Sequence, residues 1–184
     1  MKRESIIRYM VRLTLTLLVI AVVVATLLAV VNSITQPIIQ RANQEKTQKA
    51  ISLVLPGGYD REITEYADAT GLVSKVYGGS QGYAVEVNPP GFDSAITLMV
   101  GIDLEGKVLG ISVISHTESA GLGAVAAANT SKGVAFREQF VGLSGEVLVT
   151  KDGGSVDAIT NATITSRAIC DGVNAALACV AGLE

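Results

Sequence analysis

The chain has 184 residues, of which 49% are hydrophobic, so it is too apolar for a disordered segment and long enough for one ordinary domain. Its aromatic content of 4%, with no Trp and a net charge of −3, excludes the stacking platform and the basic surface of a nucleic-acid-binding protein. Two Cys and one His are too few for a zinc or iron–sulfur site, which leaves an organic group as any redox cofactor and predicts no metal site.

A single membrane-spanning helix is predicted over residues 13–35. The run Leu13–Val31 carries no charge and covers about 30 Å at helical rise. Residues 1–12 hold four Lys or Arg against one acidic residue, and such a basic flank stays in the cytoplasm. We therefore expect a cytoplasmic basic tail (1–12), a single pass through the inner or plasma membrane, and an extracytoplasmic remainder. A cleaved signal peptide that ends near residues 31–33 is the alternative.

The next segment, residues 36–58, is predicted to form a stalk helix that continues the membrane helix. It is rich in helix formers with apolar residues interspersed, and Pro56-Gly57-Gly58 is a strong signal for its end. The outer domain is then expected over residues 59–184.

Strand signals dominate the middle of that outer domain. Strands are predicted at Gly82–Val87, Ala95–Ile102 and Val108–His116, the last two joined by a turn at residues 103–106. Both strands of this hairpin are apolar at nearly every position, so we expect both of its faces to be covered, at least partly by helices.

Helices and short extended runs alternate in the last third of the chain. A helix is predicted around residues 134–140 and a second one over residues 167–180, whose apolar residues fall on one stripe. Extended runs are predicted at residues 146–149 and 156–159. The fold class is therefore α+β, with an antiparallel sheet and packed helices.

Both cysteines lie in the last predicted helix. Cys170 and Cys179 are nine residues apart, about 13 Å along the helix axis, so they cannot form a disulfide with each other. We expect buried, unpaired thiols; a thiolate ligand shared with a partner subunit is the alternative.

The segment Asp157–Ser166 places several hydroxyl side chains where an extended run turns into the last helix. Capping of the first helical N–H groups is the usual role of such hydroxyls, and one or two would suffice for it. A helix N-terminus also attracts phosphate, so the same pattern is compatible with an anion site. The hydroxyl residues are Thr160, Thr163, Thr165 and Ser166.

This segment resembles the flavinylation motif of an FMN-binding domain. The domain is shared by the G subunit of the Rnf complex and the C subunit of the sodium-translocating NADH:quinone oxidoreductase. Asp157, Thr160, Ala162 and Thr163 match the motif, which implies that Thr163 carries FMN through a phosphoester. Asn161 stands where the family usually has Gly, and Asn is one of the residues that best tolerate a positive φ.

A second stretch, residues 115–123, resembles the same family, with Ala120 in place of a usual Pro. Its two glycines would allow the backbone to approach a flavin closely. An exposed apolar patch is expected near Leu122. The one His of the chain, His116, lies in this stretch. A single His is more often a structural residue, and a position beside the flavin is the alternative. The cofactor-binding residues expected here are His116, Glu118, Gly121, Leu122 and Gly123, and the resemblance extends to Lys151 in the segment 151–154.

The resemblance implies how the flavin is attached. A Thr hydroxyl is a poor nucleophile and the motif supplies no base, so a separate magnesium-dependent flavin transferase would use FAD as the donor. Asp157 and Thr160 would be recognised by that transferase. Thr165, Ser166 and backbone N–H groups would bind the resulting phosphodiester.

The resemblance also implies an electron relay within a ferredoxin:NAD ion-translocating oxidoreductase complex. Such a chain is an electron-transfer subunit with other membrane subunits as partners and without a complete active site of its own. It carries no dinucleotide fingerprint, so no NAD binding is expected. The alternatives are the C subunit of the quinone reductase, which is longer, and a non-redox membrane-anchored binding module whose Thr-rich turn merely caps a helix.

Overall fold

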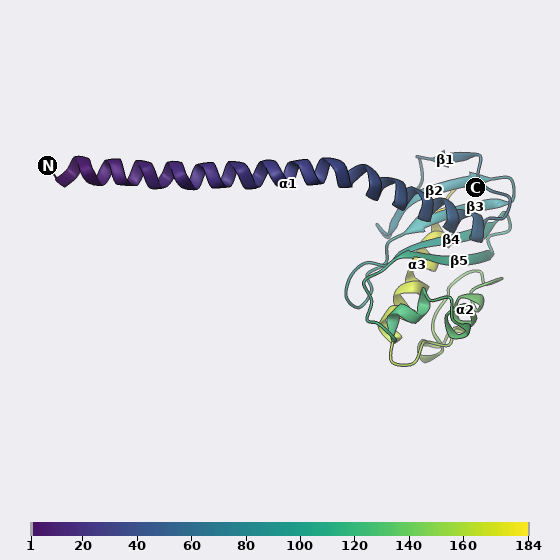
Figure 1. Cartoon of the computed structure of the whole chain (residues 1–184). Helices are drawn as coiled ribbons and strands as arrows, with labels where there is room; N and C mark the ends of the chain where they lie inside the picture. Colours follow the sequence, from purple (N-terminus) through teal and green to yellow (C-terminus); the bar gives the residue numbers. More distant parts are fainter. Residues whose placement is uncertain (1, 184) are drawn as a thin grey trace. The chain divides into compact units, whose positions relative to one another are not determined.

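The computed structural model describes residues 2–183 (Figure 1). The side chains of residues 2–6 lie outside the described residues, and with them Lys2 and Arg3 of the basic tail. The chain divides into two compact units, Met1–Glu45 and Lys46–Glu184, and each is described by itself.

The first unit is part of helix α1, which spans Lys2–Val54. Every described side chain from Ile7 to Glu45 is exposed. The hydroxyls of Thr16 and Thr26 donate to the carbonyls four residues earlier, so these two polar groups are satisfied within the helix. A helix of this kind suits a lipid surrounding. It continues without a break between the predicted membrane and stalk segments, whose limits stay predictions.

The second unit begins inside the predicted stalk. The last turns of α1 bury Ala50, Ile51 and Val54 against one face of a sheet. At Gly101 of that sheet an added Cβ would lie 2.1 Å from the carbonyl oxygen of Val54, so glycine permits the close approach. This compact unit therefore includes the end of α1 from Lys46 on, because that helix end belongs to its core.

The sheet is antiparallel and has the order β1-β2-β3-β4-β5, so each strand pairs with the next along the chain. Strand β3 is found where it was predicted, and β4 and β5 differ from the prediction by at most two residues at an end. Strands β1 and β2 were not predicted. The strands are β1 (Arg61–Ile63), β2 (Val73–Gly79), β3 (Gly82–Val87), β4 (Thr97–Asp103) and β5 (Val108–Ser115).

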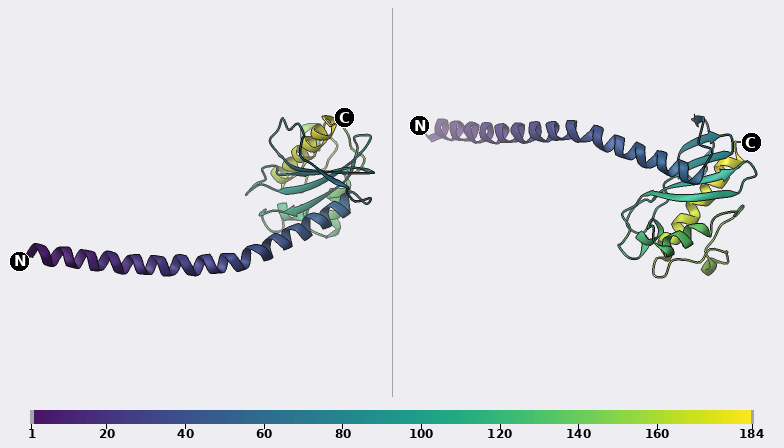
Figure 2. Two further views of the ribbon diagram at one scale, coloured as in Figure 1. Left: turned by 90° about the horizontal axis from the view of Figure 1, so that it is seen from above. Right: turned by 45° about the vertical axis from the view of Figure 1, so that its right-hand side comes forward.

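Helices cover both faces of the sheet, as the apolar hairpin predicted (Figure 2). Met99 of β4 packs against the end of α1, whereas Leu98 and Val100 face the larger core formed with helix α3 (Thr163–Ala181). Helix α2 (Ser131–Glu138) adds Phe136 to that core. Two short 3₁₀ helices, η1 (Gly123–Ala126) and η2 (Thr150–Asp152), complete the unit. The α+β fold class is confirmed.

The strand predicted at 146–149 is wrong, and the extended run at 156–159 forms no strand either. Only an isolated parallel bridge joins Val149 to Val156. The amide side chain of Asn174 accepts from Val147 N at 2.8 Å and donates to Val147 O at 2.9 Å. A side chain of α3 therefore takes the backbone bonds that a neighbouring strand would have made.

Helix α3 begins at Thr163, four residues earlier than predicted, so part of the hydroxyl-rich segment is helical. Cys170 and Cys179 are both free and buried on it, as expected. Burial raises the pKa of the Cys170 thiol to about 12, which keeps it protonated and unreactive at neutral pH.

Candidate flavin site

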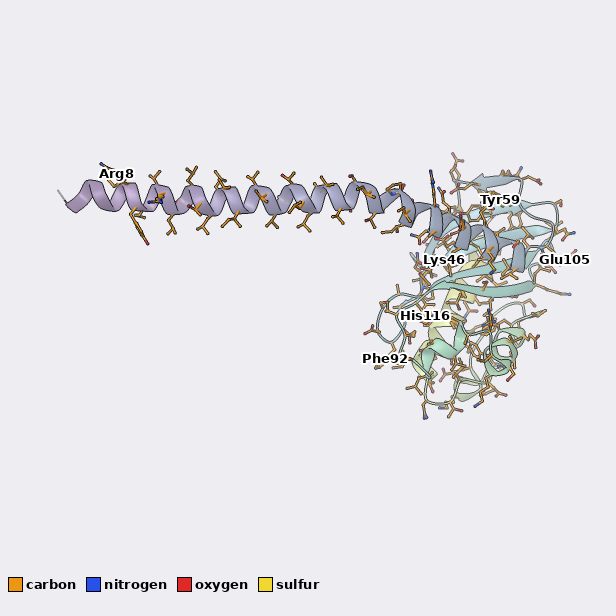
Figure 3. All side chains as sticks on the ribbon, viewed as in Figure 1. Arg8, Lys46, Tyr59, Phe92, Glu105 and His116 are labelled. Atoms are coloured by element: carbon orange, nitrogen blue, oxygen red, sulfur yellow. The ribbon has the colours of Figure 1, made fainter. Side chains whose placement is uncertain are left out.

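A cavity of about 290 Å³ opens where three segments far apart in the sequence meet. The stretches 118–123 and 161–165, each singled out by its sequence, form two of its walls. The third wall is Phe92, which projects from the loop between β3 and β4 (Figure 3) and was not predicted. The lining residues are Phe92, Glu118, Ser119, Leu122, Gly123, Asn161, Ala162, Thr163, Ile164 and Thr165.

The carboxylate of Glu118 holds the three segments together. Its Oε1 accepts from Phe92 N at 2.8 Å and its Oε2 accepts from the Thr165 hydroxyl at 2.5 Å. Glu118 is only 7% exposed, so these bonds replace the water that a buried carboxylate would otherwise need. The cavity wall thus depends on a charge that is satisfied from both sides.

Glycines make room for this carboxylate. An added Cβ at Gly91 would lie 2.3 Å from Glu118 Oε1, and one at Gly123 would lie 2.5 Å from Glu118 Oε2. Gly123 lines the cavity, but its missing side chain leaves space for Glu118 and Thr165 and not for a ligand. Gly121 adopts φ 77° and does not line the cavity.

A tight turn leads into α3. Asn161 has φ 62° and is the one non-glycine residue with positive φ among those described, which confirms the left-handed turn expected at this position. The N-cap is Ala162, and no side chain caps the helix. The capping interpretation of the hydroxyl-rich segment is therefore wrong, and the first N–H groups of α3 are free of side-chain acceptors in the described chain.

Thr163 is the first residue of α3 and its hydroxyl faces a basic side chain. Nζ of Lys151, the middle residue of η2, donates to Thr163 Oγ1 at 3.1 Å. The neighbouring Arg167 and Asp152 form a bidentate ion pair, with bonds of 2.6 and 2.7 Å. The Arg167 guanidinium holds the pKa of Asp152 below its usual range. Two cations therefore lie beside the Thr163 hydroxyl or one turn away from it.

Two of the other predicted hydroxyls, those of Thr165 and Ser166, are engaged within the protein. Thr165 is 2% exposed and donates to Glu118. Ser166 donates to Ala162 O at 2.9 Å and accepts from Ile159 N at 3.0 Å, so it stabilises the turn from beneath. Neither hydroxyl is free to bind a phosphate in this arrangement.

Like Gly121, Ser166 and Lys151, three further predicted residues do not line the cavity. Thr160 and Asp157 are exposed on the segment before the turn, and the backbone N of Asp157 donates to Gln139 Oε1 at 2.7 Å. His116 lies behind the cavity wall, beside Glu118 and Thr165. Its buried Nδ1 finds no hydrogen-bond partner among the described residues.

The rim of the cavity is apolar. Phe92, Leu122 and Ile164 are 64%, 41% and 50% exposed, which is the exposed apolar patch predicted near Leu122. A flat aromatic ligand would cover part of these side chains, and a docked protein would cover the rest.

Two families match the chain. The FMN-binding domain family matches residues 91–178, which include both cavity stretches and Phe92, and the RnfG N-terminal region matches residues 1–54.

Three relatives illustrate the likeness, and each is the G subunit of its complex. The one from the ion-translocating oxidoreductase complex of Methanosarcina acetivorans is 34% identical over 151 residues, covering 76% of this chain and 78% of the relative. The one from the ion-translocating oxidoreductase complex of Pseudomonas aeruginosa UCBPP-PA14 is 31% identical over 157 residues, covering 76% of this chain and 73% of the relative. The one from the proton-translocating ferredoxin:NAD(+) oxidoreductase complex of Clostridium ljungdahlii is 40% identical over 99 residues, covering 52% and 51%.

Proposed function

The chain belongs to the family of G subunits of ion-translocating oxidoreductase complexes, and from this premise we propose that it carries FMN on Thr163 through a phosphoester. It is an FMN-carrying, membrane-anchored electron relay of a ferredoxin:NAD oxidoreductase complex, with the other Rnf subunits as partners. The observation that carries the attachment site is the position of Thr163, at the edge of the cavity and next to Lys151.

The residues of the cavity fit a flavin. Phe92, Leu122 and Ile164 offer apolar surface for an isoalloxazine ring, and the cavity is open to solvent beside them. Bound FMN supplies a redox centre that accepts and releases electrons, and the chain binds and orients it. Because the rim is exposed, electrons can pass between the ring and a docked partner.

The charges around Thr163 support the binding of the FMN phosphate there. A phosphodiester at Thr163 would lie at the N-terminus of the 19-residue helix α3, whose dipole favours an anion. The ammonium group of Lys151 already donates to the oxygen that would carry the phosphorus, so it would neutralise part of the new charge. Since Thr165 and Ser166 are engaged elsewhere, we assign the phosphate to Lys151 and the backbone N–H groups.

A transferase is needed to make the bond. In the described chain the only side chain bonded to the Thr163 hydroxyl is that of Lys151, a donor, which cannot take up its proton. We infer that the Thr163 Oγ–P bond forms as the pyrophosphate of FAD breaks and AMP leaves, while a base of the transferase accepts the proton. Asp157 and Thr160 are exposed, so such an enzyme can contact and recognise them.

We further propose that the FMN-binding unit is extracytoplasmic, with the N-terminus in the cytoplasm. The basic residues before Leu13 support this orientation, and a covalent bond would keep the flavin from being lost outside the cell. The quinone-reductase alternative is not favoured, because the N-terminal match is to the RnfG region.

The attachment is tested on the full-length chain, co-expressed with a flavin transferase and purified in detergent. We expect the denatured protein to fluoresce in a gel and to gain the mass of FMN less water. Thr163→Ala should remove both signals, whereas Thr64→Ala, which changes an exposed Thr outside the cavity, should leave them intact. A modified Thr163→Ala chain would contradict the proposal.

The relay role is tested in the assembled complex. A complex with the Thr163→Ala chain should contain all subunits and should lose ferredoxin-dependent NAD reduction. Full activity in a complex that demonstrably lacks this flavin would place the electron path elsewhere.

A further inference from the structure

A groove of about 570 Å³, separate from the flavin cavity, runs along β5 at the edge of the sheet. Its walls are the last turns of α1 and helix α2, and its floor consists of six consecutive residues, Leu109–Ile114. Side chains alternate between the faces of a strand, so a groove lined by six in succession follows the edge of β5 and not one face of it.

The edge of β5 is open. Strand β5 pairs with β4 on one side only. On the other side, Val108 bonds to Gly142 N and Leu143 O, and no further backbone bond reaches the strand from the described residues. Between residues 109 and 114, the outward N–H and C=O groups therefore have no backbone partner among the described residues.

Register shifts interrupt the β4–β5 pairing near both ends of this edge, but its sequence lacks the charge and the Pro that would block a further strand. Exposed edge strands commonly carry a Lys, a Pro or an inward charge that blocks another strand. Residues 109–114 read LGISVI, without charge and without Pro. An edge that is open and uncharged is suited to receive a further strand.

The side chains around the groove indicate what that strand carries. Lys46, labelled in Figure 3, is exposed on α1. Lys49 lies one helical turn further along and is also exposed, and neither takes part in an ion pair within the described residues. Arg137 of α2 is half-buried and donates to Ala126 O at 2.7 Å and Ala128 O at 3.0 Å, again without a carboxylate. Only Glu138 opposes these three cations in the lining.

Apolar side chains frame the same groove. Leu53 of α1 is 65% exposed and Val141, after α2, is 54% exposed. They lie in the lining with the cations, so the complementary surface combines carboxylates with apolar side chains.

We propose that the edge of β5 receives an extended segment of another polypeptide, rich in acidic and apolar residues, as a sixth strand of the sheet. Main-chain bonds to residues 109–114 hold the segment, its carboxylates face Lys46 and Lys49, and its apolar side chains cover Leu53 and Val141. The surface is distinct from the flavin cavity, so it fixes the subunit in its complex without blocking access to the cofactor.

Hydrogen exchange on the full-length chain tests the new strand. The exchange of amides in residues 109–114 is compared between the chain alone in detergent and the purified complex. Outward amides of β5 should exchange about tenfold slower or more in the complex, because each gains a main-chain acceptor. Unchanged exchange at these amides on assembly would overturn the proposal.

Charge reversal and cross-linking identify the occupant. Lys46→Glu with Lys49→Glu should abolish the added protection, while the matched pair Lys107→Glu with Lys132→Glu, outside the groove, should retain it. A photo-cross-linker in place of Leu53 should capture an acidic segment of another subunit whose own amides are protected. Capture of lipid alone, or of a second copy of this chain, would contradict the proposal. In-gel flavin fluorescence of the same variants shows whether they still carry FMN. A loss of strand protection can therefore be told apart from a loss of the cofactor.

Discussion

Helices α1 and α3 are both long and apolar enough to cross a membrane, but they differ in how much of their apolar surface is buried within the protein. None of the most apolar stretch of α1 is buried within the protein, whereas 61% of that of α3 is. Small residues make the difference in α3: an added Cβ at Gly172 would lie 2.9 Å from the ring of Pro89, so the helix lies directly on the loop after β3. The apolar surface of α1 has no such partner in its own unit.

The comparison teaches that hydropathy measures only the need for an apolar surrounding and does not say which one. Lipid meets that need for α1, while the sheet meets it for α3. Because the sheet fixes α3, it also fixes the N-terminus of that helix, where Thr163 lies. The proposed flavin site therefore depends on the packed helix, and the membrane attachment depends on the unpacked one.

The largest effect is expected from the same substitution placed in each helix. Val173→Asp puts a carboxylate at a position of α3 that is 0% exposed and should cost about 4 kcal/mol or more, enough to unfold the unit. Val23→Asp in α1 should leave the thermal unfolding of that unit unchanged and weaken retention in the membrane. Circular dichroism of the full chain and membrane fractionation measure the two effects. Equal loss of folding in both variants would break the comparison.

A smaller effect is expected where α3 is tied to the cavity wall. Glu118→Ala leaves Phe92 N and the Thr165 hydroxyl without their acceptor and should destabilise the unit by about 2–3 kcal/mol. Glu105→Ala, at an exposed turn, should change stability by less than about 0.5 kcal/mol. Denaturant unfolding monitored by tyrosine fluorescence measures both. Equal midpoints would mean that Glu118 does not hold the wall.

The turn before α3 should respond to backbone strain alone. Asn161→Val forces a β-branched residue to φ 62° and should cost about 1–2 kcal/mol. Asn161→Gly meets the same φ without a Cβ and should stay within about 0.5 kcal/mol of the natural chain. Thermal melts separate the two substitutions, and flavin loading of the Gly variant shows whether Asn at this position limits the modification.

The smallest effect is expected at the exposed ion pair of Asp152 with Arg167. The folded-state pKa of Asp152 is lowered by the bonds from Arg167, so its contribution is present at neutral pH and is lost as the pH falls through that lowered value. Asp152→Asn should therefore be slightly less stable than the natural chain at pH 7 and equal to it in strong acid. A difference that grows on acidification would reverse the sign expected here.

The sequence predicted the parts of this molecule that depend on local pattern. The apolar run of α1, strands β3 to β5 and the positive φ at Asn161 follow from composition, alternation and the tolerance of Asn for left-handed backbone. Strand β2 was missed because the run Val73–Gly79 includes Lys75 and ends in two glycines, which hides its buried positions.

Contacts between distant residues were beyond prediction. Nothing near Glu118 indicates that its partner is Thr165, 47 residues later, or that Phe92 closes the cavity. The strand expected at 146–149 failed for the same reason, because Asn174 of α3 takes its backbone bonds. The sequence motifs identified the two segments that line the cavity. Only the fold showed that the hydroxyls of Thr165 and Ser166 already form hydrogen bonds within the protein.

The attachment of FMN to Thr163 is tested most directly by tandem mass spectrometry of the tryptic peptide Asp152–Arg167 from the flavin-loaded full-length chain. The peptide contains Ser155, Thr160, Thr163, Thr165 and Ser166, so one spectrum compares all five hydroxyls. FMN on Thr163 alone is the predicted result, since its hydroxyl borders the open cavity while Thr165 and Ser166 are buried. FMN on any of the other four, or an unmodified peptide from a fluorescent chain, would contradict the assignment.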